Sequence, residues 1–321
     1  MTALAAPPAV PEVKKSGTRG GPLRAALRLH RGALVVWAAF VALGGIGLFQ
    51  VRRLGEESAA IGTACASPPH DGLPPCDENW HALFGQTDYY STYIGLAEAL
   101  IAYLPVVLAL YAAGALVLHE QQSGRHALLW TQAISPARWL AMKLAPAALL
   151  TMLGFVPLIL LDRWARAAHP EGLGTDWYAA DVFRSTGVVT FAYALLALAV
   201  GVLVALLVRR MLPALAVTGV LMTGAIVYAN EYVRMSLWPP VTRYETSYHA
   251  VPHSALQLAN RSWDADGNEI GWMARGSVRH YREFHPESHF WPIQLVEAGI
   301  VLALAGVLTA TAFWLLRKRT P

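Results

Sequence analysis

Six long apolar runs constrain the fold of this chain more than any other feature. They cover approximately residues 33–51, 94–118, 144–161, 186–208, 211–230 and 293–316. Only Arg209-Arg210 separates the fourth run from the fifth, which predicts a tight helical hairpin. A helix needs about 20 mostly apolar residues to cross the hydrocarbon core of a bilayer. Only 14% of the 321 residues are charged, against about a quarter in a typical soluble domain. The pattern therefore predicts an all-α, polytopic membrane protein with six transmembrane helices.

Lysine and arginine gather on one side of this predicted bundle. That side holds the N-terminus, residues 119–143, Arg209-Arg210 and the C-terminus, with 14 of the 25 Lys and Arg residues but only two of the 21 acids. Short loops rich in Lys and Arg remain in the cytoplasm when a protein inserts into a membrane. We therefore expect both termini in the cytoplasm, in a multi-pass protein of the cell membrane.

The topology divides the chain into a tail and one membrane domain. Residues 1–21 are rich in Ala, Pro and Gly and have no apolar period, which predicts a disordered cytoplasmic tail before a domain at 22–321. Residues 22–31 have one apolar and one arginine-rich face, which predicts an N-terminal interfacial helix on the inner leaflet. A simple basic anchor for the first span explains them equally well. Outer loops are expected at about 52–93, 162–185 and 231–292.

A polar segment, residues 119–143, separates spans 2 and 3. Gly124 can end the incoming helix, because glycine adopts the left-handed conformation common at helix ends. Apolar residues at helical spacing follow, and Ser135-Pro136 supplies a cap and a first-turn proline for span 3. The segment therefore predicts a short helix lying across the membrane surface. A helix that merely rests on lipid headgroups is the alternative.

The same segment carries a family resemblance. Residues 120–144 read Glu-x-x-x-Gly-x-His-x-Leu-x-Trp-Thr-Gln-x-x-Ser-x-x-Arg-Trp-Leu-x-x-Lys-Leu. This run resembles the first cytoplasmic loop of type-2 ABC-transporter permeases, especially actinobacterial ones. The resemblance implies that residues 22–321 form a six-span permease domain of an exporter. It also implies that the short helix is a coupling helix, seated on a separate ABC ATPase subunit.

The resemblance implies particular contacts and partners. A second permease subunit, identical or related, would complete the pathway, and membrane lipid would surround it. The residues implied at the ATPase interface are Glu120, Gly124, Arg125, Leu128, Trp130, Thr131, Arg138 and Lys143.

Several motifs are absent from the sequence. No G-x-x-x-x-G-K-[ST] phosphate loop occurs, so we expect ATP and Mg²⁺ to be bound by the partner ATPase rather than by this chain. We expect no catalytic residue and no cofactor in this chain. Its pI of about 9.1 reflects the basic inner loops and predicts no nucleic-acid partner.

Two alternative functions are also consistent with features of the sequence. His280, His285 and His289 lie in the last outer loop and suggest a membrane-bound metal-binding protein or enzyme, although their spacing matches no zinc pattern and we expect no metal. A non-transporting membrane subunit that signals to a soluble partner through residues 119–143 is the second rival.

Two acidic residues lie inside predicted spans. Glu98 is near the outer end of span 2 and Glu297 near the outer end of span 6. A carboxylate in a membrane segment is by default a functional hypothesis. If both face the bundle interior, they line a translocation pathway that favours cations. The alternative is solvation at the membrane interface.

The outer loops carry two further predictions. Cys65 and Cys76, both on the oxidising side, are expected to form a disulfide. In the loop at 231–292, residues 270–282 alternate too poorly to predict a strand, and the resemblance implies short re-entrant or interfacial helices.

Overall fold

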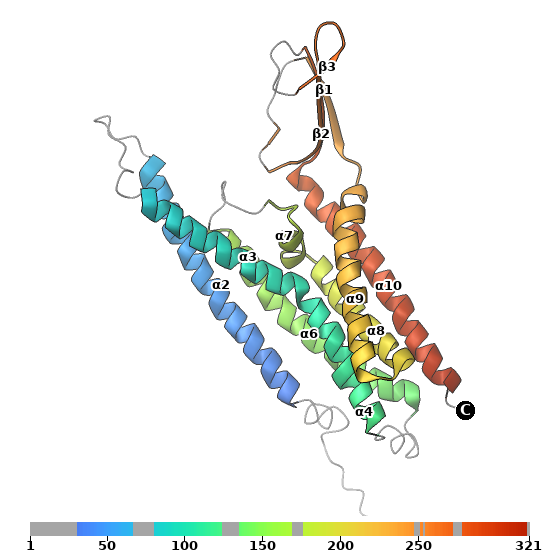
Figure 1. Ribbon diagram of the computed structural model, residues 1–321. Helices are drawn as coiled ribbons and strands as arrows, with labels where there is room; N and C mark the ends of the chain where they lie inside the picture. Colours follow the sequence, from blue (N-terminus) through green and yellow to red (C-terminus); the bar gives the residue numbers. More distant parts are fainter. Residues whose placement is uncertain are drawn as a thin grey trace, which may run out of the picture.

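The protein is an elongated helical bundle with a small sheet at one end (Figure 1). The structure, a computed structural model, describes residues 31–66, 80–123, 135–168, 176–246, 251–252, 254–271 and 278–319, and of 61–66 and 80–86 only the backbone. The predicted tail at 1–21 and most of the interfacial helix at 22–31 lie outside these residues.

The six predicted spans are confirmed. Six helical segments are long and apolar enough to cross a membrane: Arg31–Ala60, Thr87–Gln122, Pro136–Arg166, Val189–Val208, Met211–Ser236 and Glu287–Lys318. They are built from the helices α2 (Arg31–Ala66), α3 (Trp80–Tyr111), η1 (Ala112–Leu118), α4 (His119–Gln122), α6 (Pro136–Arg166), α8 (Val189–Val208), α9 (Met211–Tyr228), η2 (Ala229–Val233), η3 (Arg234–Ser236), η4 (Glu287–His289) and α10 (Phe290–Arg319).

The helix α8 forms the centre of the bundle and packs against α3, α9 and α10. Its segment is the most hydrophobic and the most buried of the six. Gly201 allows a close approach to α3, because a Cβ at this position would lie 2.3 Å from the Ala109 carbonyl oxygen. Small residues permit such contacts between membrane helices.

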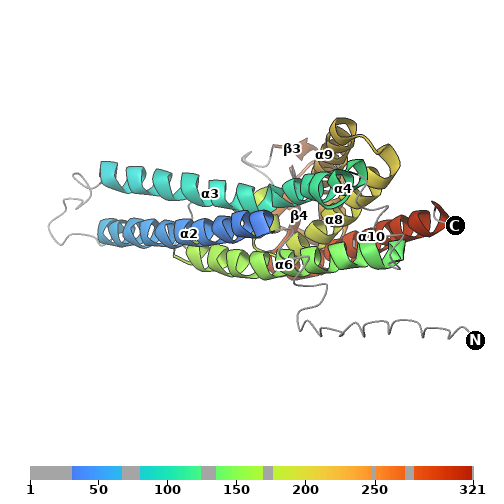
Figure 2. The same ribbon diagram turned by 90° about the horizontal axis from the view of Figure 1, so that it is seen from below.

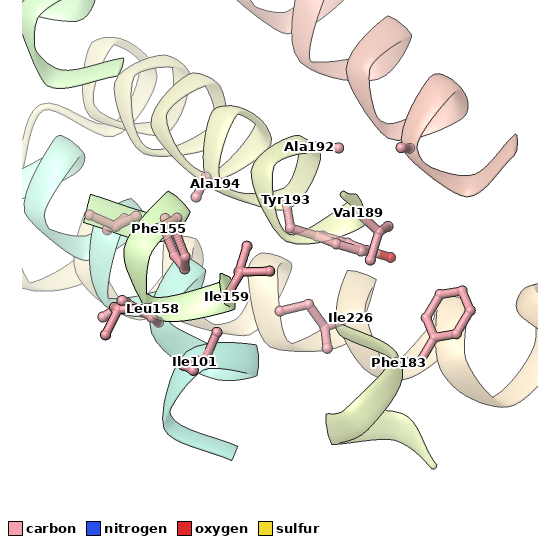
Figure 3. Packing of buried hydrophobic residues seen from close by; sticks show 14 of the residues in the cluster. Ile101, Phe155, Leu158, Ile159, Phe183, Val189, Ala192, Tyr193, Ala194 and Ile226 are labelled. Atoms are coloured by element: carbon pink, nitrogen blue, oxygen red, sulfur yellow. The ribbon is translucent and has the colours of Figure 1, made fainter. Parts of the chain in front are cut away.

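The main core joins most of the helices. Figure 3 shows residues of this cluster from four helices, among them Ile101 of α3, Phe155 of α6, Tyr193 of α8 and Ile226 of α9. Phe183, from the short helix α7 (Ala180–Ser185), closes this core at the end nearest the sheet. Since lipid tails are as apolar as these side chains, close packing rather than water exclusion holds such a core together.

The spans 4 and 5 form the predicted hairpin. α8 ends at Val208 and α9 begins at Met211. Arg209 adopts a left-handed conformation with φ of 57°, and its N–H donates to the Ala205 carbonyl over 3.2 Å. This arrangement is a typical helix stop made without glycine.

Much of the segment predicted as the outer loop at 52–93 is helical. α2 continues to Ala66 and α3 begins at Trp80, so the two helices run side by side beyond the bundle (Figure 2). At 1.5 Å per residue, the 36 residues of α2 span about 54 Å, well beyond a hydrocarbon core of about 30 Å. The hydroxyls of Ser58 on α2 and Thr87 on α3 form a hydrogen bond of 2.9 Å. Polar side chains therefore join the two helices beyond the predicted apolar runs.

The predicted disulfide receives no support from the structure. Cys65 lies in the last turn of α2, where only the backbone is described, and Cys76 lies outside the described residues. The pairing stays a prediction.

The expectation for residues 231–292 is corrected by an antiparallel sheet. Its strand order is β1 (Val241–Glu245), β4 (Arg279–His285), β2 (Leu256–Trp263) and β3 (Glu269–Ile270). In β4 the buried positions include His280 and Arg282. Because these inward residues are polar, the sequence lacks the apolar alternation that predicts a strand.

The loop at 162–185 is also more structured than predicted. α6 extends to Arg166, and α7 occupies its last residues. Trp177 is buried, and its indole donates to the Ser254 carbonyl over 2.7 Å. It therefore ties this loop to the segment around Ser254, just before β2.

The inner-loop segments gather at one end of the molecule. In Figure 1, α4, the turn between α8 and α9, and the C-terminus lie opposite the sheet. We call the end with the sheet the outer end and the other the inner end.

Candidate functional site

The first candidate site closes the base of the polar segment. Glu120 lies at the end of span 2, and Lys143 lies near the start of span 3. The Glu120 Oε1 and Lys143 Nζ atoms are 2.6 Å apart, and the Trp139 indole Nε1 donates to Glu120 Oε2 over 3.1 Å. The Lys143 ammonium lies 5.3 Å from the centre of the Trp139 ring, which adds a cation–π contact. We call these three residues the inner clamp.

The inner clamp is buried and internally paired. Glu120 is 6% exposed and Trp139 is 2% exposed. A buried carboxylate is costly unless it is paired and hydrogen-bonded, and here one oxygen meets an ammonium and the other an N–H. Because the clamp joins the two ends of the polar segment, spans 2 and 3 are held at a set distance there.

The start of span 3 confirms the predicted cap. The Ser135 hydroxyl accepts a hydrogen bond from the Arg138 N–H at 3.3 Å, and Pro136 occupies the first helical position. This cap sets the entry of α6, which places Trp139 and Lys143 on the side of Glu120.

A π-helical turn in span 2 positions Glu120, the residue that this span contributes to the clamp. η1 is a π-helix, and the His119 N–H reaches back to the Gly114 carbonyl, five residues earlier. One extra residue in a turn changes which residues face a neighbouring helix, and π-helical turns are frequent at functional sites. η1 ends at Leu118, two residues before Glu120.

The predicted ATPase-interface residues fall into three groups. Glu120 and Lys143 are brought together as an ion pair within the inner clamp. Arg138 is exposed beside them. Outside the described residues lie Gly124, Arg125, Leu128, Trp130 and Thr131. Trp139 was missed, although its position four residues before Lys143 in the quoted motif places both on one helical face.

The second candidate site is a layer of charged residues near the outer end, which we call the outer polar layer. Its members are Glu98, Asp162, Arg166, Asp181, Arg184, Arg234 and Glu297. The Arg166 guanidinium bonds the Glu98 carboxylate, and Arg184 Nη2 lies 2.9 Å from Asp181 Oδ1.

Glu297 makes the most complete ion pair of this layer. Arg234 Nε donates to Glu297 Oε2 over 2.9 Å, and Arg234 Nη2 donates to Oε1 over 3.2 Å. The Tyr193 hydroxyl also donates to Oε1 over 3.0 Å. Arg234 is 0% exposed and lies 4.2 Å from the centre of the Phe183 ring.

Glu98 and Glu297 are thus buried in the bundle rather than solvated at its surface. Each has an arginine partner, so neither presents an uncompensated negative charge. Those partners lie 68 and 63 residues away in the sequence, a separation over which the sequence shows no periodic signal. Their role in a translocation pathway stays a prediction.

An apolar groove lies between α6, α8 and α10, with a volume of about 620 Å³. Leu144, Leu198 and Phe313 are among its lining residues, and Thr309 is the polar one. The groove therefore suits apolar groups rather than ions.

The outer histidines do not converge. His285 Nδ1 lies 2.9 Å from His289 Nδ1, and its Nε2 lies 3.1 Å from the Met235 carbonyl. His280 Nδ1 instead lies 3.0 Å from the Ser262 hydroxyl. Among the described residues, no group of three or more His, Cys, Asp or Glu side chains could hold a metal ion.

Comparison with known proteins finds one family for most of the chain. The family described as "ABC-2 membrane transporter related" matches residues 32–234. This range is more than half of the chain and contains spans 1 to 5, the clamp and part of the outer polar layer. No curated protein and no solved structure matches the chain. The chain therefore belongs to the ABC-2 membrane transporter related family.

Proposed function

We propose that this permease subunit works in an ABC exporter and that residues 119–143 couple it to a separate ATPase subunit. The observation that carries the proposal is the inner clamp, which joins the two ends of that segment through Glu120, Trp139 and Lys143. The family membership supports a partnership with an ABC ATPase in general.

The clamp offers a way to pass movement from the loop to the bundle. Glu120 belongs to span 2, whereas Trp139 and Lys143 belong to span 3. A push on the segment between them therefore moves both spans together, in the manner of other rigid-body switches. The partner ATPase binds ATP and Mg²⁺ and supplies the energy, and this chain contributes no catalytic residue.

The assembly in this proposal contains two permease subunits above two ATPases. α2 and α9 carry apolar side chains that are exposed in the single chain, for example Val36 on α2 and Val220 on α9. These faces have the chemistry to meet lipid or a second permease subunit. We place the assembly in the cell membrane, with both termini and residues 119–143 in the cytoplasm.

The orientation is open to a labelling test. Single cysteines at Gln122 and Ser288, both exposed positions, are introduced after Cys65 and Cys76 are replaced by serine. The charge pattern predicts that an impermeant thiol reagent labels position 288 but not position 122 in intact cells. Opening the cells with detergent is the control and should label both. Labelling of position 122 in intact cells would reverse the topology and remove the coupling proposal.

Replacing Trp130 with alanine tests the coupling helix itself. Trp130 is proposed to fill a groove of the ATPase, and truncating such an anchor typically costs about 2 kcal/mol. We expect the affinity for the ATPase subunit to fall roughly 30-fold. The stimulation of ATP hydrolysis should fall as well. The measurement is co-purification and ATPase activity at equal membrane abundance.

A matched control for this substitution is Trp314→Ala. Trp314 is an exposed tryptophan near the inner end of α10, so its loss should leave ATPase binding unchanged. If Trp130→Ala binds the ATPase as the wild type does, the segment is a helix on lipid and couples nothing.

A further inference from the structure

One acid of the outer polar layer differs from the others. Glu98, Asp181 and Glu297 each have an arginine within ion-pair distance. Asp162, on α6, is 0% exposed and forms no ion pair within the described residues. Its Oδ2 lies 2.9 Å from the Ser185 hydroxyl, and its Oδ1 has no hydrogen-bond partner there.

The cations near Asp162 are committed elsewhere. The groups that face it are Tyr90 and Glu98 of α3, Arg163 and Arg166 of α6 and Ser185 of α7. Arg166 bonds Glu98. Arg163 donates to the Thr186 carbonyl over 3.2 Å and lies 5.2 Å from the centre of the Trp291 ring. Within the described residues, neither guanidinium lies within ion-pair distance of Asp162, so a charged Asp162 carboxylate would be buried without an ion-pair partner.

The hydrogen-bond partner of Asp162 is Ser185, which lies on α7. Its hydroxyl oxygen lies 2.9 Å from Asp162 Oδ2 and 3.3 Å from the Val182 carbonyl oxygen. A hydroxyl has one hydrogen to donate, so it cannot donate to both oxygens at once. With a proton on Asp162, the carboxyl can donate to Ser185, which leaves the Ser185 hydrogen for the Val182 carbonyl, an acceptor that also takes the Thr186 hydroxyl over 2.6 Å.

We propose that Asp162 is a proton-binding site and that its protonated carboxyl latches α7 to α6 at the outer end of the bundle. A bare carboxylate inside a membrane protein is costly, so a proton is retained while the latch is closed. When water reaches Asp162 in an open state, the proton leaves to that water and the carboxylate becomes hydrated. The latch between α6 and α7 then opens.

The position of α7 links the latch to the packing of α8 against α10. α7 leads directly into α8, and the first N–H of α8, at Val189, donates to the Gln294 side chain of α10 over 2.9 Å. The Gln294 amide in turn bonds the Phe183 carbonyl of α7. Release of α7 therefore loosens the contact of α8 with α10 at the outer end. This inference needs no ATPase partner, so it stands or falls separately from the coupling proposal.

Infrared spectroscopy of the full chain in lipid bilayers tests the proton directly. At neutral pH, the wild type should show the C=O stretch of a protonated carboxyl group, which shifts in D₂O. Asp162→Asn should lose this band, whereas Glu98→Gln should keep it, because Glu98 is ionised beside Arg166. The asparagine has the shape of the protonated acid, so its Tm should change by less than about 2 °C.

A second variant reports on the latch without touching the acid. Ser185→Ala should keep the band but move it to higher wavenumber, because the carboxyl loses its hydrogen-bond partner. A wild type without the band, or a band that survives in Asp162→Asn, would overturn the proposal. So would a rise in the Tm of the wild type, but not of Asp162→Asn, on adding Na⁺ or K⁺, because the site would then take a metal cation.

Discussion

Replacing Arg234 with methionine is expected to destabilise the protein by about 3–5 kcal/mol, the usual cost of breaking a buried ion pair from one side. Arg234 is fully buried and holds both oxygens of Glu297. Without it, Glu297 remains inside the bundle and keeps the hydrogen bond from the Tyr193 hydroxyl but loses its counter-ion. We expect a lower thermal unfolding temperature in lipid nanodiscs and less full-length protein in the membrane.

The double variant Arg234→Met with Glu297→Gln separates lost charge pairing from lost packing. Replacing a buried pair by groups that need no counter-ion is often neutral, so the double variant should recover most of the lost stability. Arg243→Met is the matched control, because Arg243 is half-exposed on β1 and its guanidinium lies 4.0 Å from Glu245. Exposed pairs contribute about 0–1 kcal/mol. Equal losses for Arg234→Met and Arg243→Met would contradict the importance of the buried pair.

Reversing the charge of Glu120 should abolish communication through the inner clamp. Glu120→Lys places two ammonium groups where one carboxylate now meets Lys143 at 2.6 Å, and it also removes the acceptor of the Trp139 N–H. If the clamp joins spans 2 and 3 as proposed, ATPase stimulation should fall at least about tenfold, which corresponds to about 1.4 kcal/mol. The measurement is ATP hydrolysis by the partner subunit at equal membrane abundance.

Charge exchange provides the decisive comparison. The double variant Glu120→Lys with Lys143→Glu restores opposite charges, so it should recover part of the stimulation that each single variant loses. His119→Lys is the control, since it adds a positive charge at an exposed neighbouring position and should change little. If the exchange recovers nothing while the protein remains folded, the two residues act through separate contacts.

The elements that depend on local sequence were predicted well. The six spans, the α8–α9 hairpin and the Ser135 cap are all as expected. Each depends on residues close together in the chain: a long apolar run, two arginines between two such runs, or a serine before a proline. The boundaries of the spans were predicted less well, because helices such as α2 continue into polar residues.

The sheet and the outer polar layer were not predicted for a common reason. The inward residues of β4 include His280 and Arg282, and the acids of the layer find partners on other helices. Buried polar residues resemble surface residues in a sequence, because their burial depends on partners far away in the chain. The same limit applied to Trp139, whose bond to Glu120 crosses the loop.

Six membrane crossings follow from the amino-acid sequence alone, because apolar length and the backbone's need for internal hydrogen bonds leave only helices as a solution. The family also follows from the sequence, since its model matches residues 32–234. How the charged residues are used depends instead on the folded structure. It paired Glu120 with Lys143 and Glu297 with Arg234, and it left Asp162 with a hydroxyl. The reason is physical: the cost of a buried charge is set by the groups within a few ångströms of it, and only the folded chain brings those groups together.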